Sequence, residues 1–299
     1  MKNYLLKKAP LLGLIGTLKY YITVEGYYRL ISLLDFRSGV TIVERTTPIV
    51  VSLTAIPERY NKLHLCIESL LQQNIKPDHI ILWLSDENIP LPKSLTRLSK
   101  RGLEIRYCED IRSYTKIVYT LGDHPRALVI TADDDLFYPK KWLSGLYNAY
   151  KVEPNVIHCH RAHQMTFKPK GKLDDYKKWV FCSQEPTPAS FLIFPTGAGG
   201  VLYPPNALDK RAVNKKLFTA LAPTADDVWL KAMSILNKTK CRNTGIYQHE
   251  FTQIKGTQKK ALWRENTEND MNDKQIKAVW GYFDIYSFFP INGTARQKL

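Results

Sequence analysis

The stretch RALVITADDD, residues 126–135, gives the clearest indication of the fold, because an apolar run ends abruptly in three aspartates. A short, β-branched apolar run predicts a buried strand. In α/β sheets ligands bind beyond the carboxyl ends of strands, where Asp133, Asp134 and Asp135 would lie. Three adjacent carboxylates repel one another, and carboxylate oxygens are ligands that Mg²⁺ and Mn²⁺ prefer. The triplet predicts a divalent-metal site, with a solvated acidic loop or a helix cap as the alternative.

Strand and helix patterns alternate on the N-terminal side of this stretch. Apolar runs predict strands, and apolar residues at helical spacing predict helices between them. The predicted strands are TPIVVSLTAI (47–56), HIILWLS (79–85) and LEIRYCE (103–109), and the predicted helices are 61–73, 91–100 and 115–122. Short alternating elements favour an α/β domain with a mostly parallel sheet flanked by helices.

The pattern is looser after residue 150. NVIHCHRAH (155–163) predicts a strand, FLIFPTGAGGVLYPP (191–205) is apolar with a glycine cluster, and ADDVWLKAMSILN (225–237) predicts an amphipathic helix. The chain from about 255 is polar with scattered aromatic residues. We therefore expect an N-terminal extension over 1–45, one catalytic domain over 46–255, and a C-terminal tail over 256–299 that packs on it.

Composition restricts the class of protein. The chain has 299 residues, of which 44% are hydrophobic, so it can bury a large core and is not a disordered protein. Its 43 Lys and Arg against 28 Asp and Glu give a net charge of +15, which attracts polyanions such as phosphorylated molecules or anionic lipid. Its 5 cysteines are scattered without a CxxC pair, which favours a reducing compartment.

Residues 1–36 are both basic and apolar. The apolar run 9–18 is far shorter than the roughly 20 residues needed to span a bilayer. Lysines and tyrosines beside leucines suit a helix that lies at a lipid interface. A helix that packs on its own domain fits equally well, and both interpretations stay open.

Six segments, taken in order, resemble the nucleotide-sugar glycosyltransferases of the GT-A fold, close to the bacterial family-2-like enzymes of surface polysaccharide synthesis. The TADDDLFYP segment is similar to the DXD motif of that family, and the resemblance covers roughly residues 47–250. The six segments are VSLTAIPERY (51–60), LWLSD (82–86), SYTK (113–116), TADDDLFYP (131–139), GAGGVLYPP (197–205) and TADDVWL (224–230).

The resemblance implies a Rossmann-like GT-A fold with an N-terminal helical extension. It also implies a metal-dependent transfer of sugar from a nucleoside diphosphate, UDP before others, with Mn²⁺ or Mg²⁺ as cofactor. Asp135 would hold the metal, and His249 is a candidate further ligand. The residues expected to contact the nucleotide or its diphosphate are Thr54, Arg59, Asp86, Lys116, Asp133 and Asp134. Asp86 departs from the family pattern, because LSDENI stands where DDGS is usual.

The acceptor side of the site is implied by the later segments. An acidic pair, Asp226 and Asp227, would supply the base that deprotonates the acceptor hydroxyl in an inverting reaction, with Asp227 as the main candidate. The same pair would also suit the N-terminus of a helix for purely structural reasons. The residues expected to line the acceptor or sugar pocket are Arg161, His163, Gly199 and Gly200.

The expected acceptor is a glycan or a lipid-linked saccharide, and the expected location is the cytoplasm or the inner face of the cytoplasmic membrane, bound peripherally to an anionic surface. Two other functions compete with this interpretation. A phosphoryl transferase could use the Asp133/Asp135 pair, although Leu136 and Phe137 stand where small and hydroxyl residues are expected. The charge of +15 would also suit a nucleic-acid-binding protein, but the sequence contains no zinc finger or aromatic RNA-binding motif, so no nucleic-acid partner is expected.

Overall fold

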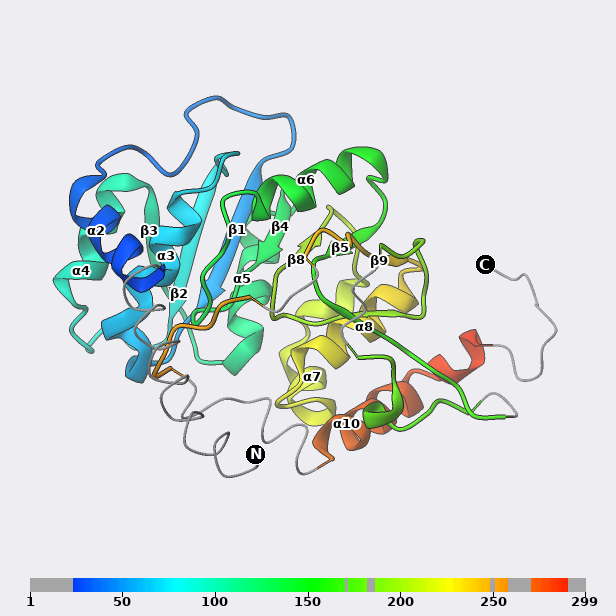
Figure 1. Ribbon diagram of the computed structural model, residues 1–299. Coiled ribbons are helices and arrows are strands. Elements are labelled where there is room, and N and C mark those ends of the chain that lie inside the picture. The colour runs from blue at the N-terminus through cyan, green and yellow to red at the C-terminus, as the bar shows by residue number, and fades with distance from the viewer. Residues whose placement is uncertain (1–23, 170–171, 182–185, 248–250, 258–269, 290–299) are drawn as a thin grey trace, which may run out of the picture.

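The computed structural model describes residues 24–169, 172–181, 186–247, 251–257 and 270–289 (Figure 1). Its main sheet has seven strands in the order β3-β2-β1-β4-β8-β5-β9. The strands are β1 (Ile49–Thr54), β2 (His79–Leu84), β3 (Leu103–Tyr107), β4 (Leu128–Thr131), β5 (Ile157–Cys159), β8 (Val201–Tyr203) and β9 (Cys241–Asn243). Only β8 runs antiparallel to its neighbours, β4 and β5, and the remaining pairs are parallel. The expected α/β fold with a mostly parallel central sheet is confirmed.

The four parallel strands of the N-terminal half are the ones that the sequence predicts. β1 lies between β2 and β4, with Ser52 opposite Ile81 on one side and Thr131 on the other. Nearly every residue of β1, β2 and β4 is buried, which is why these strands are continuous apolar runs without polar alternation. Because the strands are parallel and in register, their carboxyl ends meet at one edge of the sheet.

Helices cover both faces of the sheet (Figure 1). On one face, α3 (Tyr60–Leu71) and α6 (Trp142–Val152) share a buried apolar core with β1, β2 and β4. On the other, α5 (Thr115–Asp123) contacts β1 and β4, and α8 (Asp226–Leu236) belongs to a second core. Two further helices, α7 (Lys215–Leu221) and α10 (Met271–Tyr282), contact each other, and α10 also packs on α8.

The C-terminal half differs in detail from the sequence-based prediction. The segment 155–163 forms two strands, because β5 pairs with β8 in the main sheet whereas β6 (Ala162–Gln164) pairs with β7 (Ile193–Pro195) in a separate two-stranded sheet. In the N-terminal half, the segment predicted as a helix over 91–100 also differs, because it divides into a short helix α4 (Lys93–Thr96) and the 3₁₀ turn η3 (Arg97–Arg101). The other 3₁₀ turns are η2 (Pro57–Arg59), η4 (Arg112–Tyr114), η5 (Tyr176–Lys178), η6 (Lys210–Val213) and η8 (Ile285–Phe288).

The N-terminal helix α2 (Gly26–Leu34) packs against α3. It falls within the segment for which a helical extension is expected, while residues 1–23 lie outside the described part of the chain. Over the residues that the structure describes, no helix combines the length and apolar character needed to cross a bilayer.

Candidate active site

The three aspartates lie in a loop that follows β4, beyond the carboxyl end of the strand. Several buried groups hold the backbone of this loop. The Asp133 N–H donates to the Tyr138 hydroxyl at 2.7 Å, and the Cys66 thiol donates to the Asp133 carbonyl at 3.2 Å. From the other side, the Ile254 N–H donates to the Asp135 carbonyl at 2.7 Å. The chain therefore fixes where each carboxylate points.

Arg59 lies against two of the three carboxylates. Its guanidinium Nη1 donates to Asp134 and lies 3.2 Å from the Asp135 carboxylate, while its Nε donates to the Thr257 carbonyl at 3.0 Å. Burial raises the pKa of Asp134 to about 7, and Asp135 adds to this effect, although Arg59 opposes it. The Arg59 guanidinium thus partly offsets the electrostatic repulsion between the carboxylates of the triplet.

Lys116 connects the triplet to the second acidic segment. It lies in the first turn of α5, and its buried ammonium is 2.9 Å from the Asp133 carboxylate and 3.3 Å from that of Asp226. Burial alone would lower the pKa of Lys116, but the surrounding carboxylates outweigh burial and raise it well above its ordinary value. The two acidic segments, which are about 90 residues apart in sequence, are therefore neighbours through one permanently charged lysine.

Asp227 is held by a backbone group. Both of its carboxylate oxygens accept the Gly197 N–H, at 3.0 and 3.1 Å. Burial, together with the neighbouring Asp226 carboxylate, raises the pKa of Asp227 to about 7, against the effect of Lys116. A methyl group on Gly197 would lie 2.8 Å from the Lys116 ammonium, 3.4 Å from Asp227 and 3.7 Å from Asp133. Gly197 therefore marks the point at which these three side chains converge.

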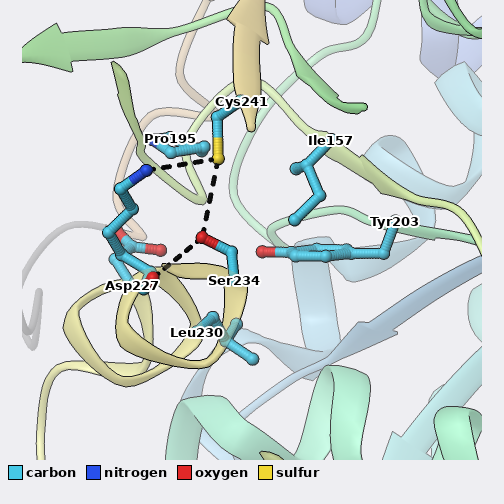
Figure 2. A pocket seen from close by; sticks show the side chains of 8 residues that line it. Ile157, Pro195, Tyr203, Asp227, Leu230, Ser234 and Cys241 are labelled. Atoms are coloured by element: carbon cyan, nitrogen blue, oxygen red, sulfur yellow. Dashed lines mark hydrogen bonds between the residues drawn. The ribbon is translucent and has the colours of Figure 1, made fainter. Parts of the chain in front are cut away.

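A small polar pocket lies behind Asp227, on the core side of α8 (Figure 2). The buried Lys231 ammonium, one helical turn after Asp227, is 3.5 Å from the Cys241 thiol, and the Ser234 hydroxyl donates to the Lys231 carbonyl at 2.8 Å. Burial lowers the pKa of Lys231. The apolar lining of the pocket includes Ile157 and Leu230.

The glycine pair predicted to line the acceptor pocket forms the tight turn before β8. Gly199 and Gly200 have φ values of +103° and +96°, and the Trp142 indole donates to the Gly199 carbonyl at 2.6 Å. A Cβ on Gly200 would lie 2.5 Å from the Trp142 ring. Arg161 is close by, because its guanidinium donates to the Thr196 hydroxyl at 2.8 Å. The Gly200 N–H donates to the Gly197 carbonyl at 3.0 Å, so this turn is connected to the residue that donates to Asp227.

Three other predicted site residues that the structure describes have contacts with groups outside this cluster. The Thr54 hydroxyl donates to the Trp83 carbonyl at 2.9 Å, and the Asp86 carboxylate accepts the Asn88 N–H at 2.9 Å. Both lie at the carboxyl ends of neighbouring strands, β1 and β2. His163 is buried with its ring 4.2 Å from that of Phe181, and burial lowers its pKa to about 3. His249 lies outside the described residues.

The carboxylates suit a divalent cation that is shared with a phosphorylated ligand. Within the described ranges, no three His, Cys, Asp or Glu side chains form a complete ligand set. Mg²⁺ and similar ions are commonly bound by one or two carboxylates together with substrate phosphates. Asp134 and Asp135 already receive the Arg59 guanidinium, so their positions attract positive charge. The carboxylate oxygens of the triplet are therefore ligands of the type that Mg²⁺ or Mn²⁺ prefers.

Three residues that lie at or beside the site are not among those that the sequence predicts. Gly197 belongs to the glycine cluster, but its role as an N–H donor to Asp227 depends on a contact 30 residues away. Tyr138 follows Asp133 by five residues, close enough to suggest a local contact, and its hydroxyl also donates to the Asp133 carbonyl at 3.3 Å. Lys231 lies four residues after Asp227 on the predicted helix, a spacing that places both on one face.

No protein-family model and no curated protein matches the chain. Among solved structures, the chain is similar to a mannosyltransferase, PcManGT from Pyrobaculum calidifontis, in complex with GDP-mannose and Mn²⁺. That match has 13% identity and a TM-score of 0.46, and it covers 90% of this chain and 74% of the other. The chain is also similar to CMP:2-keto-3-deoxy-manno-octonic acid synthetase in complex with CTP, with 10% identity, a TM-score of 0.38, and coverage of 66% and 89%. The ligands in these two structures are ligands of those two proteins.

Proposed function

We propose that this protein is a metal-dependent glycosyltransferase. It transfers a sugar from a nucleoside diphosphate, UDP before others, to a glycan or a lipid-linked saccharide, as in bacterial surface polysaccharide synthesis. The proposed reaction inverts the configuration at the sugar carbon, with Asp227 as the base.

The observation that carries this proposal is the bridge that Lys116 makes between the two acidic segments. Its ammonium lies between Asp133 of the triplet and Asp226 of the pair. A transferase needs a cation-binding site for the leaving group and a base for the attacking group within reach of one substrate. The bridge brings the two into one site, and it also supplies a fixed positive charge between them.

Asp227 has the properties of a base for an acceptor hydroxyl. It is half-buried, its pKa is raised towards neutral pH, and the Gly197 N–H fixes the orientation of its carboxylate. In the reaction the acceptor oxygen bonds to the anomeric carbon while the bond from that carbon to the diphosphate oxygen breaks. The hydroxyl proton passes to Asp227, and the nucleoside diphosphate leaves with the electron pair.

The negative charge that develops on the leaving diphosphate requires nearby cations. Lys116 supplies one as a point charge, and Arg59 can present a guanidinium fork to phosphate oxygens. Asp135 would hold Mn²⁺ or Mg²⁺, with His249 as a candidate further ligand. When bound, the metal would neutralise charge on the diphosphate.

The remaining predicted residues divide between donor and acceptor. Asp133, Asp134, Thr54 and Asp86 are proposed to face the nucleotide, in keeping with their positions at the carboxyl ends of β1, β2 and β4. On the acceptor side we propose Arg161, His163, Gly199 and Gly200. A lipid-linked acceptor would place the protein at the inner face of the cytoplasmic membrane.

The test is to incubate the full chain with UDP-, GDP-, CDP- and TDP-sugars and Mn²⁺ and to measure release of the nucleoside diphosphate. We expect one donor class to be cleaved, and Asp135→Asn to abolish cleavage without loss of folded protein. Asp123→Asn is the matched control, because Asp123 is an exposed aspartate at the end of α5. Full activity of Asp135→Asn would contradict the proposal. Release of inorganic phosphate in place of a nucleoside diphosphate would indicate phosphoryl transfer instead.

A further inference from the structure

The helix α2 exposes apolar residues and buries polar ones. Glu25 and Ser32 are 2% and 6% exposed, whereas Leu30, Leu33, Leu34 and Phe36 are 56%, 57%, 65% and 84% exposed. A helix on the surface of a soluble domain normally turns its leucines towards the core. Single exposed apolar residues are ordinary, but a contiguous group marks an interaction surface. We call Leu30, Leu33, Leu34 and Phe36 the α2 face.

The inverted orientation of α2 is fixed by specific contacts. On its inner side, Tyr28 stacks on Phe137 with ring centroids 4.9 Å apart, and its hydroxyl donates to the Tyr138 carbonyl at 3.4 Å. The Ser32 hydroxyl accepts from the Arg97 guanidinium at 2.9 Å. Rotating the leucines inward would break these contacts, so their exposure is built into the fold. Phe137 and Tyr138 are the second and third residues after the acidic triplet, so the inner side of α2 packs beside that loop.

The exposed charges beside the α2 face are mostly basic. Glu25 pairs with Arg29 at 2.6 Å and Asp35 pairs with Arg37 at 2.9 Å, so these four side chains contribute no net charge. Arg101 connects η3 to this segment, because its Nε donates to the Arg37 carbonyl at 3.0 Å. Lys93 on α4 and Lys100 on η3 are further exposed basic residues and add positive charge. Glu44 is an exposed acid farther along the connection to β1.

The sequence that precedes α2 is also both basic and apolar. Residues 1–23 contain four lysines and no aspartate or glutamate, together with many leucines. Interfacial helices combine these features, because lysines attract anionic headgroups while aliphatic side chains enter the boundary of the acyl region. Each basic residue near an anionic surface strengthens binding to it.

The size of the α2 face argues for a lipid surface and against a second copy of the chain. A stable protein interface buries about 800 Å² on each partner, whereas nine helical residues extend only about 14 Å. A bilayer needs no complementary shape, and each aliphatic group that it takes up strengthens binding. We propose that the α2 face and the basic residues beside it bind the surface of an anionic lipid bilayer.

This proposal is independent of the catalytic one, because binding to vesicles is measured without any substrate. The experiment sediments the full chain with phosphatidylcholine vesicles, with or without phosphatidylglycerol. It compares the wild type with a variant carrying Leu30→Ser, Leu34→Ser and Phe36→Ser, all at exposed positions that the core does not need. The control variant carries Val152→Ser, Val213→Ser and Tyr282→Ser, which are exposed apolar residues on α6, η6 and α10.

We expect the wild type and the control to bind vesicles that contain phosphatidylglycerol, and added salt to weaken binding because it screens the basic residues. The α2-face variant should bind at least about tenfold more weakly, which corresponds to about 1.4 kcal/mol. Wild-type binding by that variant, or no binding of the wild type to anionic vesicles, would overturn the proposal. A dimer in solution that the variant abolishes, without vesicle binding, would overturn it in favour of self-association.

Discussion

The two acidic segments of the site differ in what holds their carboxylates. In the triplet after β4, Asp133 pairs with Lys116, and both Asp134 and Asp135 lie against Arg59. In the pair at the start of α8, Asp227 is held by the N–H of Gly197. Asp134 and Asp227 both have a pKa raised to about 7, but the Asp134 carboxylate receives a guanidinium whereas the Asp227 carboxylate receives a backbone N–H. In the proposed function, this contrast assigns the binding of charge to the triplet and proton transfer to Asp227.

The largest effect that we predict follows from removing the base. Asp227→Asn keeps an oxygen that can accept the Gly197 N–H, so the fold should persist, but the amide cannot take a proton. General-base catalysis typically contributes about 10²–10⁴-fold, so kcat/KM for sugar transfer should fall by that amount. Nucleotide binding, measured by calorimetry, should change little. A variant with wild-type transfer would mean that the two segments do not divide the work in this way.

The pH dependence of the wild-type rate also tests whether Asp227 acts as the base. Because the raised pKa of Asp227 is about 7, the carboxylate that acts as base forms only as the pH rises through that value. The rate constant kcat/KM should therefore increase with pH across this range and then level off. A profile that is flat from pH 5 to 8 would argue against Asp227 as the base.

The next largest predicted effect is a loss of stability when Lys116, which lies between the two acidic segments, is replaced. Lys116→Met leaves Asp133 and Asp226 close together without their shared cation. Removal of one member of a buried ion pair costs about 3–5 kcal/mol, and since Asp133 is partly exposed we expect about 3 kcal/mol. The measurement is urea unfolding at neutral pH. Lys93→Met, at an exposed position on α4, is the control, and equal stability of the two variants would remove Lys116 from its bridging role.

A smaller loss of stability is expected from a substitution at Gly197, where the side chains of Lys116, Asp227 and Asp133 converge. In Gly197→Ala the added methyl would lie 2.8 Å from the Lys116 ammonium and 3.4 Å from Asp227. The lysine must move, so we expect a loss of about 1–3 kcal/mol, as for other insertions into packed sites. Gly122→Ala is a matched control, because no atom lies within 4 Å of the Cβ that it would gain. If both variants are equally stable, the packing at Gly197 is looser than the distances indicate.

The smallest predicted effect has the opposite sign. Lys231 is buried beside Cys241, and burial lowers its pKa below the ordinary 10.5, so the folded protein carries a desolvation cost. Lys231→Met should stabilise the protein by about 1 kcal/mol at pH 7. That cost is fully present below the lowered folded pKa. It declines as the pH rises from the folded pKa towards 10.5, because there the unfolded chain binds more protons.

Unfolding experiments on wild type and Lys231→Met across that range should therefore show a shrinking difference as the pH increases. A difference that stays constant with pH would show that the lysine does not titrate abnormally. Destabilisation by Lys231→Met at every pH would show that the ammonium has a stabilising partner.

The parallel half of the fold could be predicted from the sequence because its strands are buried on both faces and read as apolar runs. β1, β2, β3 and β4 all lie within or close to their predicted ranges. The C-terminal half could not be predicted in this way. Its strand β9 has only three residues, one of them arginine, and it is stabilised by pairing with β5. The helix α10 buries Ile276, Val279 and Trp280 at helical spacing. Because most of its other residues are polar, this spacing is difficult to recognise in the sequence.

The site was predictable to a similar extent. The acidic triplet is a local pattern at the end of a strand, so sequence alone could identify it. Contacts across the chain decide the rest: Lys116 reaches Asp226 from 110 residues away, and Arg59 reaches Asp134 from 75 residues away. Such distances are set by topology, which a single sequence does not specify. The roles of individual residues in binding and catalysis stay predictions.

The most direct test of the central claim is the thermal unfolding midpoint of the full chain with UDP, GDP, CDP and TDP, each with and without Mn²⁺. A ligand that binds only the folded state at a concentration of 100 times its Kd stabilises it by about 2.7 kcal/mol. We predict that one nucleotide raises the midpoint, only when Mn²⁺ is present, and that Asp135→Asn abolishes this shift. If no nucleotide raises the midpoint, or if the shift is the same in Asp135→Asn or without metal, the triplet is not the metal–diphosphate site.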